Sequence, residues 1–384
     1  MIDKQIYYKL FSNTGSYVET FYDFVAGEYS SSINAGYSDM RLQIPKQFDE
    51  ALTGINFNGY VQRFVSDGDG SDILTYTGYI SSQRNVIKNQ ETVEINLAGY
   101  YSKLTQDIFF SGNNLTVPYN TDTGLIARNI LAQYVAQNTG TVITYSSSTI
   151  ANTNITRNIL FSGQTYADCL NDAKDWSGAN YYFFLDNDNK VYLKTVNTTT
   201  TPTHYFVLGR DIIDIEYTSS IEQMKTGVYF WNSLATGNIS RIMKLYTAST
   251  RATYGRIFEL RKDGRYTQSV AMDAWASKYL TAYGNPIDTI TLRIADNNTM
   301  RYNSSQIDIE NVGVGDTFQI LNIEPDSPLA GKVYYITSVT DYQGQYITVK
   351  SVDPSSYVAK ELVKLNQKQQ TNDWGVTYNQ TFTT

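Results

Sequence analysis

The residue types that carry out most enzyme chemistry are scarce in this chain. His204 is the only histidine and Cys169 the only cysteine among 384 residues. A hydrolase triad needs an imidazole beside a nucleophile, and His204 lies in a turn-like segment near Pro202, which favours a solvated loop histidine. Because of these counts, a two-histidine metal site, a cysteine-rich zinc site and an intrachain disulfide are all excluded.

Motifs for nucleotide binding or nucleophilic catalysis are also missing. The sequence contains no G-x-S-x-G, no P-loop and no G-x-G-x-x-G followed by a helix. The acidic runs at 67–69 and 186–188 resemble calcium loops only superficially, since an EF-hand needs Gly at position 6 and Glu at position 12. Counted from Asp186, those positions hold Val191 and Asn197. Both runs are therefore interpreted as turns.

No pair of carboxylates is singled out by spacing for glycoside hydrolysis, although 37 acidic residues leave that chemistry open. The many tyrosine and tryptophan side chains could line a sugar-binding groove. However, the apolar stripes of the expected helices account for Tyr166, Trp176, Trp275 and Tyr279. Trp231 and Trp374 remain candidates for an interface. We therefore predict no catalytic, cofactor-binding or metal-binding residue and no cofactor, and we expect that the protein is not an enzyme.

The composition favours a β-rich protein with wide protein contacts. Charged residues make up 17% of the chain, and 33 tyrosines stand against 16 phenylalanines and 4 tryptophans. Aromatic and β-branched side chains fit a pleated sheet, and tyrosine supplies contact area at a low entropic cost. The net charge of −7 disfavours binding of nucleic acid and would keep a passing polyanion from adhering.

The start of the chain lacks a signal-peptide pattern, and no apolar stretch of 18 residues occurs in it. We expect a protein without a membrane segment that is assembled in a host cytoplasm.

Hydrophobic periodicity predicts a mainly β chain interrupted by helices. Strands dominate up to about residue 107, with a hairpin of 60–65 and 73–79 around residues 67–70. One helix of about four turns is predicted where apolar residues recur from Leu125 to Val135, before Gly140. A second carries the stripe from Tyr166 to Trp176, with Thr165 and Asp168 as the cap, and a third spans about 268–283. A hairpin turns at 186–189, a strand pair spans about 206–232, and strands return after residue 286.

The returning strands of residues 286–353 form a compact all-β module that can close as a small barrel. Residues 354–384 follow as a short helix and a C-terminal arm.

Two neighbouring segments resemble a recurrent stretch of phage tail hub proteins. Residues 165–182 read TYADCLNDAKDWSGANYY and residues 186–193 read DNDNKVYL, which matches a T-x-x-D-x-L helix leading to a hairpin that turns at D-x-D-x-K. The Y-x-G-x-I of residues 76–80 and the V-G-D of residues 314–316 follow the order of that family. The resemblance covers residues 1 to about 355.

The resemblance implies a baseplate or tail-tip hub with two tube-like β-barrels and α/β insertions. On this plan, residues 1–107 form the first β-barrel, which is completed by 206–235, and residues 286–353 form the second β-barrel. Residues 108–205 and 236–285 form the α/β insertion domain. Such a hub is a homotrimer in the virion, where six barrels match a sixfold distal tail or tail tube ring above and a threefold spike or fibre below. Its further partner would be the tape measure protein, and DNA would pass through the lumen without specific binding. Acidic side chains are expected to line that lumen.

Two other classes of protein stay open. A surface carbohydrate-binding β-module or adhesin would be a monomer with an exposed aromatic groove. A hydrolase would bring two carboxylates together in a cleft.

Overall fold

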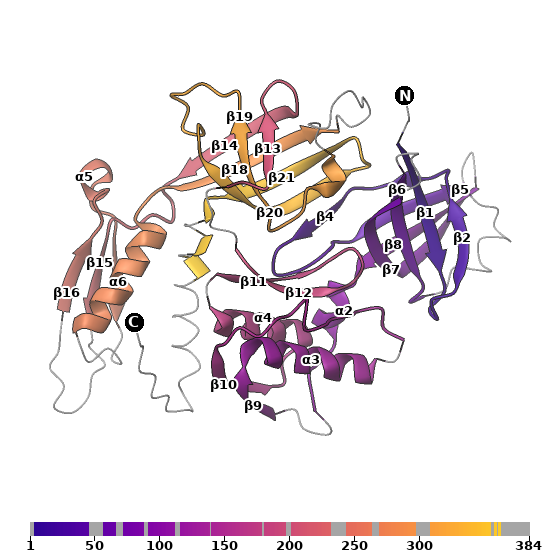
Figure 1. Ribbon diagram of the computed structural model, residues 1–384, viewed down its shortest axis with the longest axis horizontal. Helices are drawn as coiled ribbons and strands as arrows, with labels where there is room; N and C mark the ends of the chain where they lie inside the picture. Colours follow the sequence, from indigo (N-terminus) through magenta and orange to yellow (C-terminus); the bar gives the residue numbers. More distant parts are fainter. Residues whose placement is uncertain are drawn as a thin grey trace. The chain divides into compact units, whose positions relative to one another are not determined.

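Strands dominate the structure, a computed structural model that describes residues 4–45, 57–66, 72–87, 91–111, 116–138, 140–178, 180–196, 201–231, 243–262, 269–296, 308–354, 357–358 and 360–361. The chain divides into two units (Figure 1). The first comprises residues 1–177, 181–216 and 291–351, and the second comprises 178–180, 217–290 and 352–384. The mainly β class expected from composition is confirmed.

The first unit contains a seven-stranded sheet in the order β2-β1-β6-β7-β8-β5-β3. Its strands are β1 (Gln5–Phe11), β2 (Tyr17–Phe21), β3 (Val25–Ala26), β5 (Met40–Pro45), β6 (Tyr60–Ser66), β7 (Asp72–Ile87) and β8 (Glu91–Gly99). The predicted hairpin of 60–65 and 73–79 is confirmed as β6 and β7, while its turn lies outside the described residues. Period-two burial, as in Met40, Leu42 and Ile44, directs one face to the core.

A second sheet of the same unit has the order β13-β19-β20-β21-β18-β14. Its strands are β13 (His204–Val207), β14 (Ile212–Ser220), β18 (Ile287–Ala295), β19 (Thr317–Leu321), β20 (Val333–Tyr342) and β21 (Tyr346–Val352). A further strand, β4 (Tyr29–Ser32), comes from the early part of the chain and pairs antiparallel with β20. The ends of β14 and β18 extend into the second unit.

Short links force both sheets to curl. Seven strands at about 4.8 Å spacing span about 29 Å, but β2 and β3, on opposite edges, are joined by residues 22–24 alone, which reach about 14 Å. In the second sheet the edge strands β13 and β14 are joined by residues 208–211, and a bridge between Leu208 and Ile212 connects them. Each sheet therefore brings its edges together at one corner, as a barrel requires.

The two sheets share one strand order. In each sheet, three consecutive strands form a meander, and the strand that comes before the meander in the sequence lies beside its last strand. The resulting order is β6-β7-β8-β5 in one sheet and β19-β20-β21-β18 in the other. The outer neighbours β3 and β14 also correspond. Through β1, strand β2 runs parallel to β6, just as β13 runs parallel to β19. The chain thus contains the same arrangement twice, with β1 as an addition to the first copy.

A helical module lies between the two sheets in the sequence. It contains α2 (Tyr101–Gln106), β9 (Thr116–Asp122), α3 (Thr123–Gln137), β10 (Thr156–Ser162), α4 (Tyr166–Ser177), β11 (Tyr181–Leu185) and β12 (Val191–Thr195). The cap of α4 is as predicted, because the Asp168 N–H donates to Thr165 Oγ1 at 3.1 Å. Tyr166 and Cys169 are buried and Trp176 is half-buried, as expected for a core-facing stripe.

The second unit holds a three-stranded sheet covered by one helix. The sheet has the order β16-β15-β17, with β15 (Gly227–Trp231), β16 (Met243–Thr247) and β17 (Phe258–Lys262). The short helix α5 (Arg251–Tyr254) precedes β17, and α6 (Ser269–Tyr283) packs Trp275 and Tyr279 against Val228 and Phe230. The predicted third helix and the buried positions of Trp275 and Tyr279 are confirmed.

The structure differs from the expected domain plan in two places. Residues 206–235 do not complete the first sheet, because β13 and β14 belong to the second sheet and β15 to the second unit. For the same reason the strand pair expected at 206–232 is wrong. The stretches 108–205 and 236–285, expected to form one insertion, fall largely in different units. The period of a strand indicates its buried face but not its partner, which explains the error.

At the end of the chain, residues 354, 357–358 and 360–361 are helical, in agreement with the short helix expected there. The rest of the predicted C-terminal arm, with Trp374, lies outside the described residues. No helix in the described part of the chain is long and apolar enough to cross a membrane.

Candidate assembly surfaces

The residues considered for chemistry take structural positions. His204 is not in a solvated loop as expected; it begins β13, and its Nε2 lies 3.0 Å from Asp316 Oδ2. Asp316 belongs to the V-G-D segment and precedes β19, the parallel partner of β13. The pair therefore connects the starts of two neighbouring strands.

Cys169 and Asp186 are also occupied structurally. Burial raises the pKa of the Cys169 thiol well above its usual range, so the reactive thiolate is disfavoured. The Asp186 carboxylate accepts the N–H groups of Asp188 and Lys190 at 3.0 and 2.8 Å, which closes the hairpin turn between β11 and β12. The interpretation of this acidic run as a turn is confirmed. The run at 67–69 lies outside the described residues.

The two barrels are connected by one strand that pairs across from the early part of the chain and by buried charged side chains. Strand β4 lies between β3 and β5 of the first sheet in the sequence, but it pairs with β20 of the second sheet, with Tyr29 opposite Asp341 and Ser32 opposite Ser338. We call this region, with the charged clusters described next, the barrel junction. Sequence reasoning missed it, because β4 carries the short, neutral segment YSSS, which has no strong strand signal.

A buried arginine occupies the centre of the barrel junction. Arg63 of β6 has 1% of its side chain exposed, and its Nη1 donates to Tyr29 Oη at 3.0 Å and to Thr75 Oγ1 at 2.7 Å. The same nitrogen lies 3.4 Å from Asp341 Oδ2 of β20, and Tyr29 Oη also donates to Asp341, at 3.2 Å. A single cation thus links strands of both sheets.

A second cluster connects the beginning of β1 with the second sheet. Lys4 Nζ lies 2.8 Å from Asp296 Oδ2, 3.1 Å from Asp308 Oδ1 and 2.5 Å from Glu310 Oε2. Glu310 lies in the 3₁₀ helix η1 (Ile309–Asn311), and 1% of its side chain is exposed. Burial, followed by the hydrogen bond with Asp308, raises the pKa of Glu310 to about 8, although Lys4 acts in the opposite direction.

This cluster predicts a pH-dependent stability. The pKa of Glu310 is higher in the folded chain than its ordinary value of 4.5, so the folded chain binds the proton more tightly. That stabilisation is complete below about pH 4.5 and is lost as the pH rises through 8. We expect the melting temperature of Glu310→Gln to fall less than that of the parent protein when the pH rises from 5 to 9. Differential scanning fluorimetry measures this difference.

The control for this experiment is Glu324→Gln, because Glu324 is exposed in the segment after β19. It should follow the parent at every pH. Equal pH profiles for Glu310→Gln and the parent would contradict the assignment of the raised pKa to Glu310.

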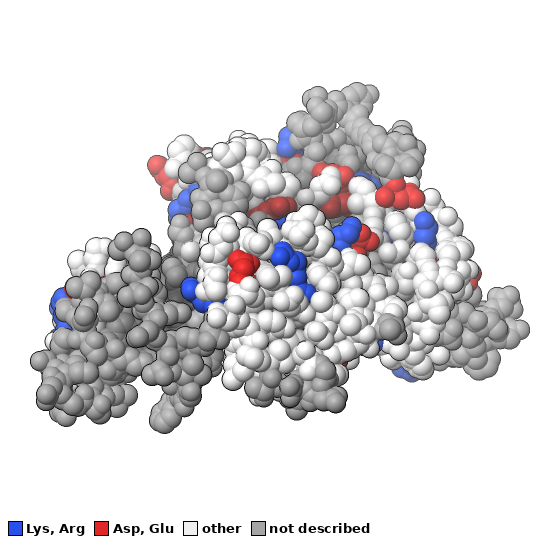
Figure 2. Space-filling view, turned by 60° about the horizontal axis from the view of Figure 1, so that its bottom comes forward, with Lys and Arg blue, Asp and Glu red and all other residues white. Residues whose placement is uncertain are grey.

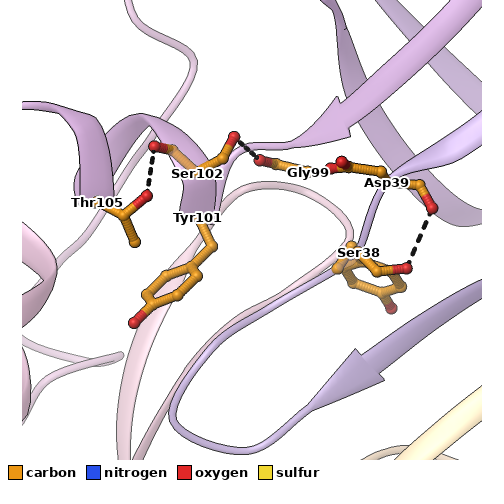
Figure 3. A pocket seen from close by; sticks show the side chains of 7 residues that line it. Ser38, Asp39, Gly99, Tyr101, Ser102 and Thr105 are labelled. Carbon is orange, nitrogen blue, oxygen red and sulfur yellow. Dashed lines mark hydrogen bonds between the residues drawn. The ribbon is translucent and has the colours of Figure 1, made fainter.

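A surface hollow lies beside α2 (Figure 3) and is lined by Tyr37, Ser38, Asp39, Gly99, Tyr101, Ser102 and Thr105. The serine and threonine hydroxyls of its lining donate to nearby backbone carbonyls. Ser102 Oγ donates to Gly99 O at 2.6 Å, and Thr105 Oγ1 donates to Ser102 O at 2.8 Å. Both hydroxyls are thus occupied by backbone carbonyls of the α2 region, which favours a structural role for the hollow.

Apolar side chains are exposed along the edge strands of both barrels. Tyr17 of β2 and Val25 of β3 are 58% and 65% exposed, and Tyr205 of β13 and Ile213 of β14 are 46% and 55% exposed. Figure 2 shows that charged side chains are scattered among uncharged ones on one face of the molecule. Depletion of charge together with exposed aromatic and aliphatic side chains is typical of protein interfaces.

No protein-family description matches this sequence, and no curated protein does either. Solved structures do match, over nearly their whole length. The 43 kDa tail protein of prophage MuSo2 from Shewanella oneidensis has a TM-score of 0.62 at 12% identity, over 92% of this chain and 99% of that one. A tail protein from Neisseria meningitidis MC58 has a TM-score of 0.60 at 12% identity, over 93% and 99%.

The prophage tail protein gp18 from Listeria monocytogenes EGD-e also matches, with a TM-score of 0.53 at 11% identity, over 95% of this chain and 99% of that one. At sequence identities this low, the structural similarity establishes the fold alone. The chain therefore has the fold of phage tail proteins, and the predicted resemblance to that family is confirmed at the level of the fold.

Proposed function

We propose that the protein is a structural component of a phage tail tip or baseplate, located in the virion. In this proposal it is a homotrimeric hub that adapts a sixfold tail tube or distal tail ring to a threefold spike or fibre. Its further partner is the tape measure protein. The fold shared with phage tail proteins supports the structural role.

The observation that carries the proposal is the repeated strand order within one chain. Two barrels of the same arrangement, linked through the barrel junction, make one chain equivalent to two members of a ring. Three copies then present six barrels while keeping threefold symmetry. The buried contacts of Arg63 and Lys4 support this reading, since a ring element must hold its two barrels in one orientation.

A conduit for DNA is the second part of the proposal. The chain carries a net charge of −7, and an acidic bore would repel a passing polyanion rather than bind it. The alternative, a carbohydrate-binding adhesin, is less well supported, because Tyr166, Trp275 and Tyr279 are buried against other side chains and are not available to a sugar. We also propose that the protein is not an enzyme.

The assembly state tests the proposal. Light scattering of the purified chain at several concentrations should give the mass of a trimer, or of a ring that forms when a tail-tube or distal tail protein is added. Electron microscopy of that ring should show a central opening. A chain that stays monomeric with those partners and is retained on a glycan column would instead indicate the adhesin.

A further inference from the structure

In the three-stranded sheet of the second unit, one face is covered by α6 (Figure 1). On β15, Val228 and Phe230 point to α6 and are fully buried. Side chains alternate along a strand, so Tyr229 and Trp231 point to the opposite face. Both are only partly buried.

The strand register brings further apolar residues to this face. Tyr229 lies opposite Leu245 of β16 and Leu260 of β17, and Trp231 lies opposite Met243. Met243 is 66% exposed, Leu260 53% and Leu245 38%. Directly opposed residues on one face are in contact distance, so they form a continuous surface. We call Tyr229, Trp231, Met243, Leu245, Phe258 and Leu260 the open face.

Two arginines border the open face. The ring of Phe258 lies over Gly227, where an added Cβ would come within 2.6 Å of it. The guanidinium carbons of Arg251 and Arg256 lie 5.4 and 5.0 Å from the centre of the Phe258 ring. Both arginines are exposed, and among the described residues neither forms an ion pair. The border of this apolar surface is therefore positively charged.

The charge of the chain is divided unequally. Residues 217–290 contain nine lysines and arginines and five acidic residues, a balance of +4. The whole chain carries −7, so the remainder carries −11. A basic segment with an apolar face is thus part of a chain whose other residues are strongly acidic.

We propose that the open face docks on an acidic surface of a second copy of this chain. The apolar side chains supply buried area, and Arg251 and Arg256 supply charge complementarity to the acidic remainder of the neighbour. The proposal rests on the proposed ring of copies and goes further, because it assigns one contact between copies to the second unit. Nucleic acid is a poorer occupant, since three of the six side chains are aliphatic and cannot stack on bases.

A matched pair of leucines tests the apolar part. Leu260 and Leu160 are both strand leucines, 53% and 52% exposed, and only Leu260 belongs to the open face. Threonine keeps the preference for a strand and removes the apolar surface. We expect Leu260→Thr to raise the dissociation constant of the assembly at least tenfold by sedimentation velocity, whereas Leu160→Thr leaves it unchanged.

A charge reversal tests the electrostatic part. The double variant Arg251→Glu with Arg256→Glu should weaken assembly at 50 mM salt more than at 500 mM, because salt screens exposed charges. The exposed Arg84 of β7 supplies the control, and Arg84→Glu should have no such effect. Circular dichroism of every variant confirms that the fold is kept.

The outcomes separate this inference from the proposed hub. If the parent protein forms a trimer and Leu260→Thr forms the same trimer with unchanged affinity, the inference is overturned and the proposed hub is not affected. A parent that never assembles would overturn both. If Leu260→Thr assembles normally but no longer binds a tail partner or DNA, the open face has another occupant and the second copy is excluded.

Discussion

Replacement of Arg63 by methionine is expected to lower the free energy of unfolding by about 3–5 kcal/mol, the usual cost of breaking a buried ion pair from one side. The change leaves Asp341 and the Tyr29 hydroxyl without their cation at the place where the two sheets meet. Methionine keeps much of the volume, so the loss reflects the polar contacts. Urea unfolding followed by tryptophan fluorescence measures it.

Arg41→Met is the matched control. Arg41 also pairs with a carboxylate from a neighbouring strand, Glu94, but 61% of its side chain is exposed. Exposed pairs contribute about 0–1 kcal/mol. Similar losses for the two variants would contradict the assignment of Arg63 as the central link of the barrel junction.

Asp211→Ala should give the second large effect, a loss of about 2–3 kcal/mol, because charged hydrogen bonds contribute more than neutral ones. Asp211 closes the corner between β13 and β14, and its side chain has no exposed area. Its carboxylate accepts the Val207 N–H at 2.8 Å and two hydrogen bonds from Arg210 at 2.7 and 2.8 Å. Thermal and urea unfolding measure the loss.

The corner offers its own controls. Asp214→Ala removes an exposed carboxylate three residues along the chain and should change stability by less than about 0.5 kcal/mol. Asp211→Asn keeps an oxygen for the Val207 N–H but loses the charge, so an intermediate loss is expected. If Asp211→Ala unfolds like Asp214→Ala, the corner does not depend on this carboxylate.

Local elements were predictable because their signals are local. The helices α3, α4 and α6 follow from apolar spacing together with caps and stops such as Thr165 and Gly284. The hairpin of β11 and β12 follows from the turn residues between two apolar runs. The repeated barrel arrangement came only from the resemblance, since the two strand sets share no evident sequence pattern.

The barrel junction left weak traces in the sequence. Arg63 lies two residues from both Val61 and Val65, so the strand period places its charge on the same buried face as these valines. That pattern indicates a buried partner for Arg63 without naming it. The partner, Asp341, lies 278 residues further along the chain, and nothing local identifies one acid among 37.

The sequence by itself determined the mainly β class, the positions of the main helices, the scarcity of catalytic residue types and the acidic balance of the chain. These properties depend on composition and on neighbouring residues. The tertiary structure decided the strand order, the crossing of β4 to β20 and the parallel pairing of β13 with β19. It also decided which carboxylates meet Lys4 and Arg63. The physical reason is that strand period defines the buried face, whereas the choice of partner depends on how distant segments close into one core.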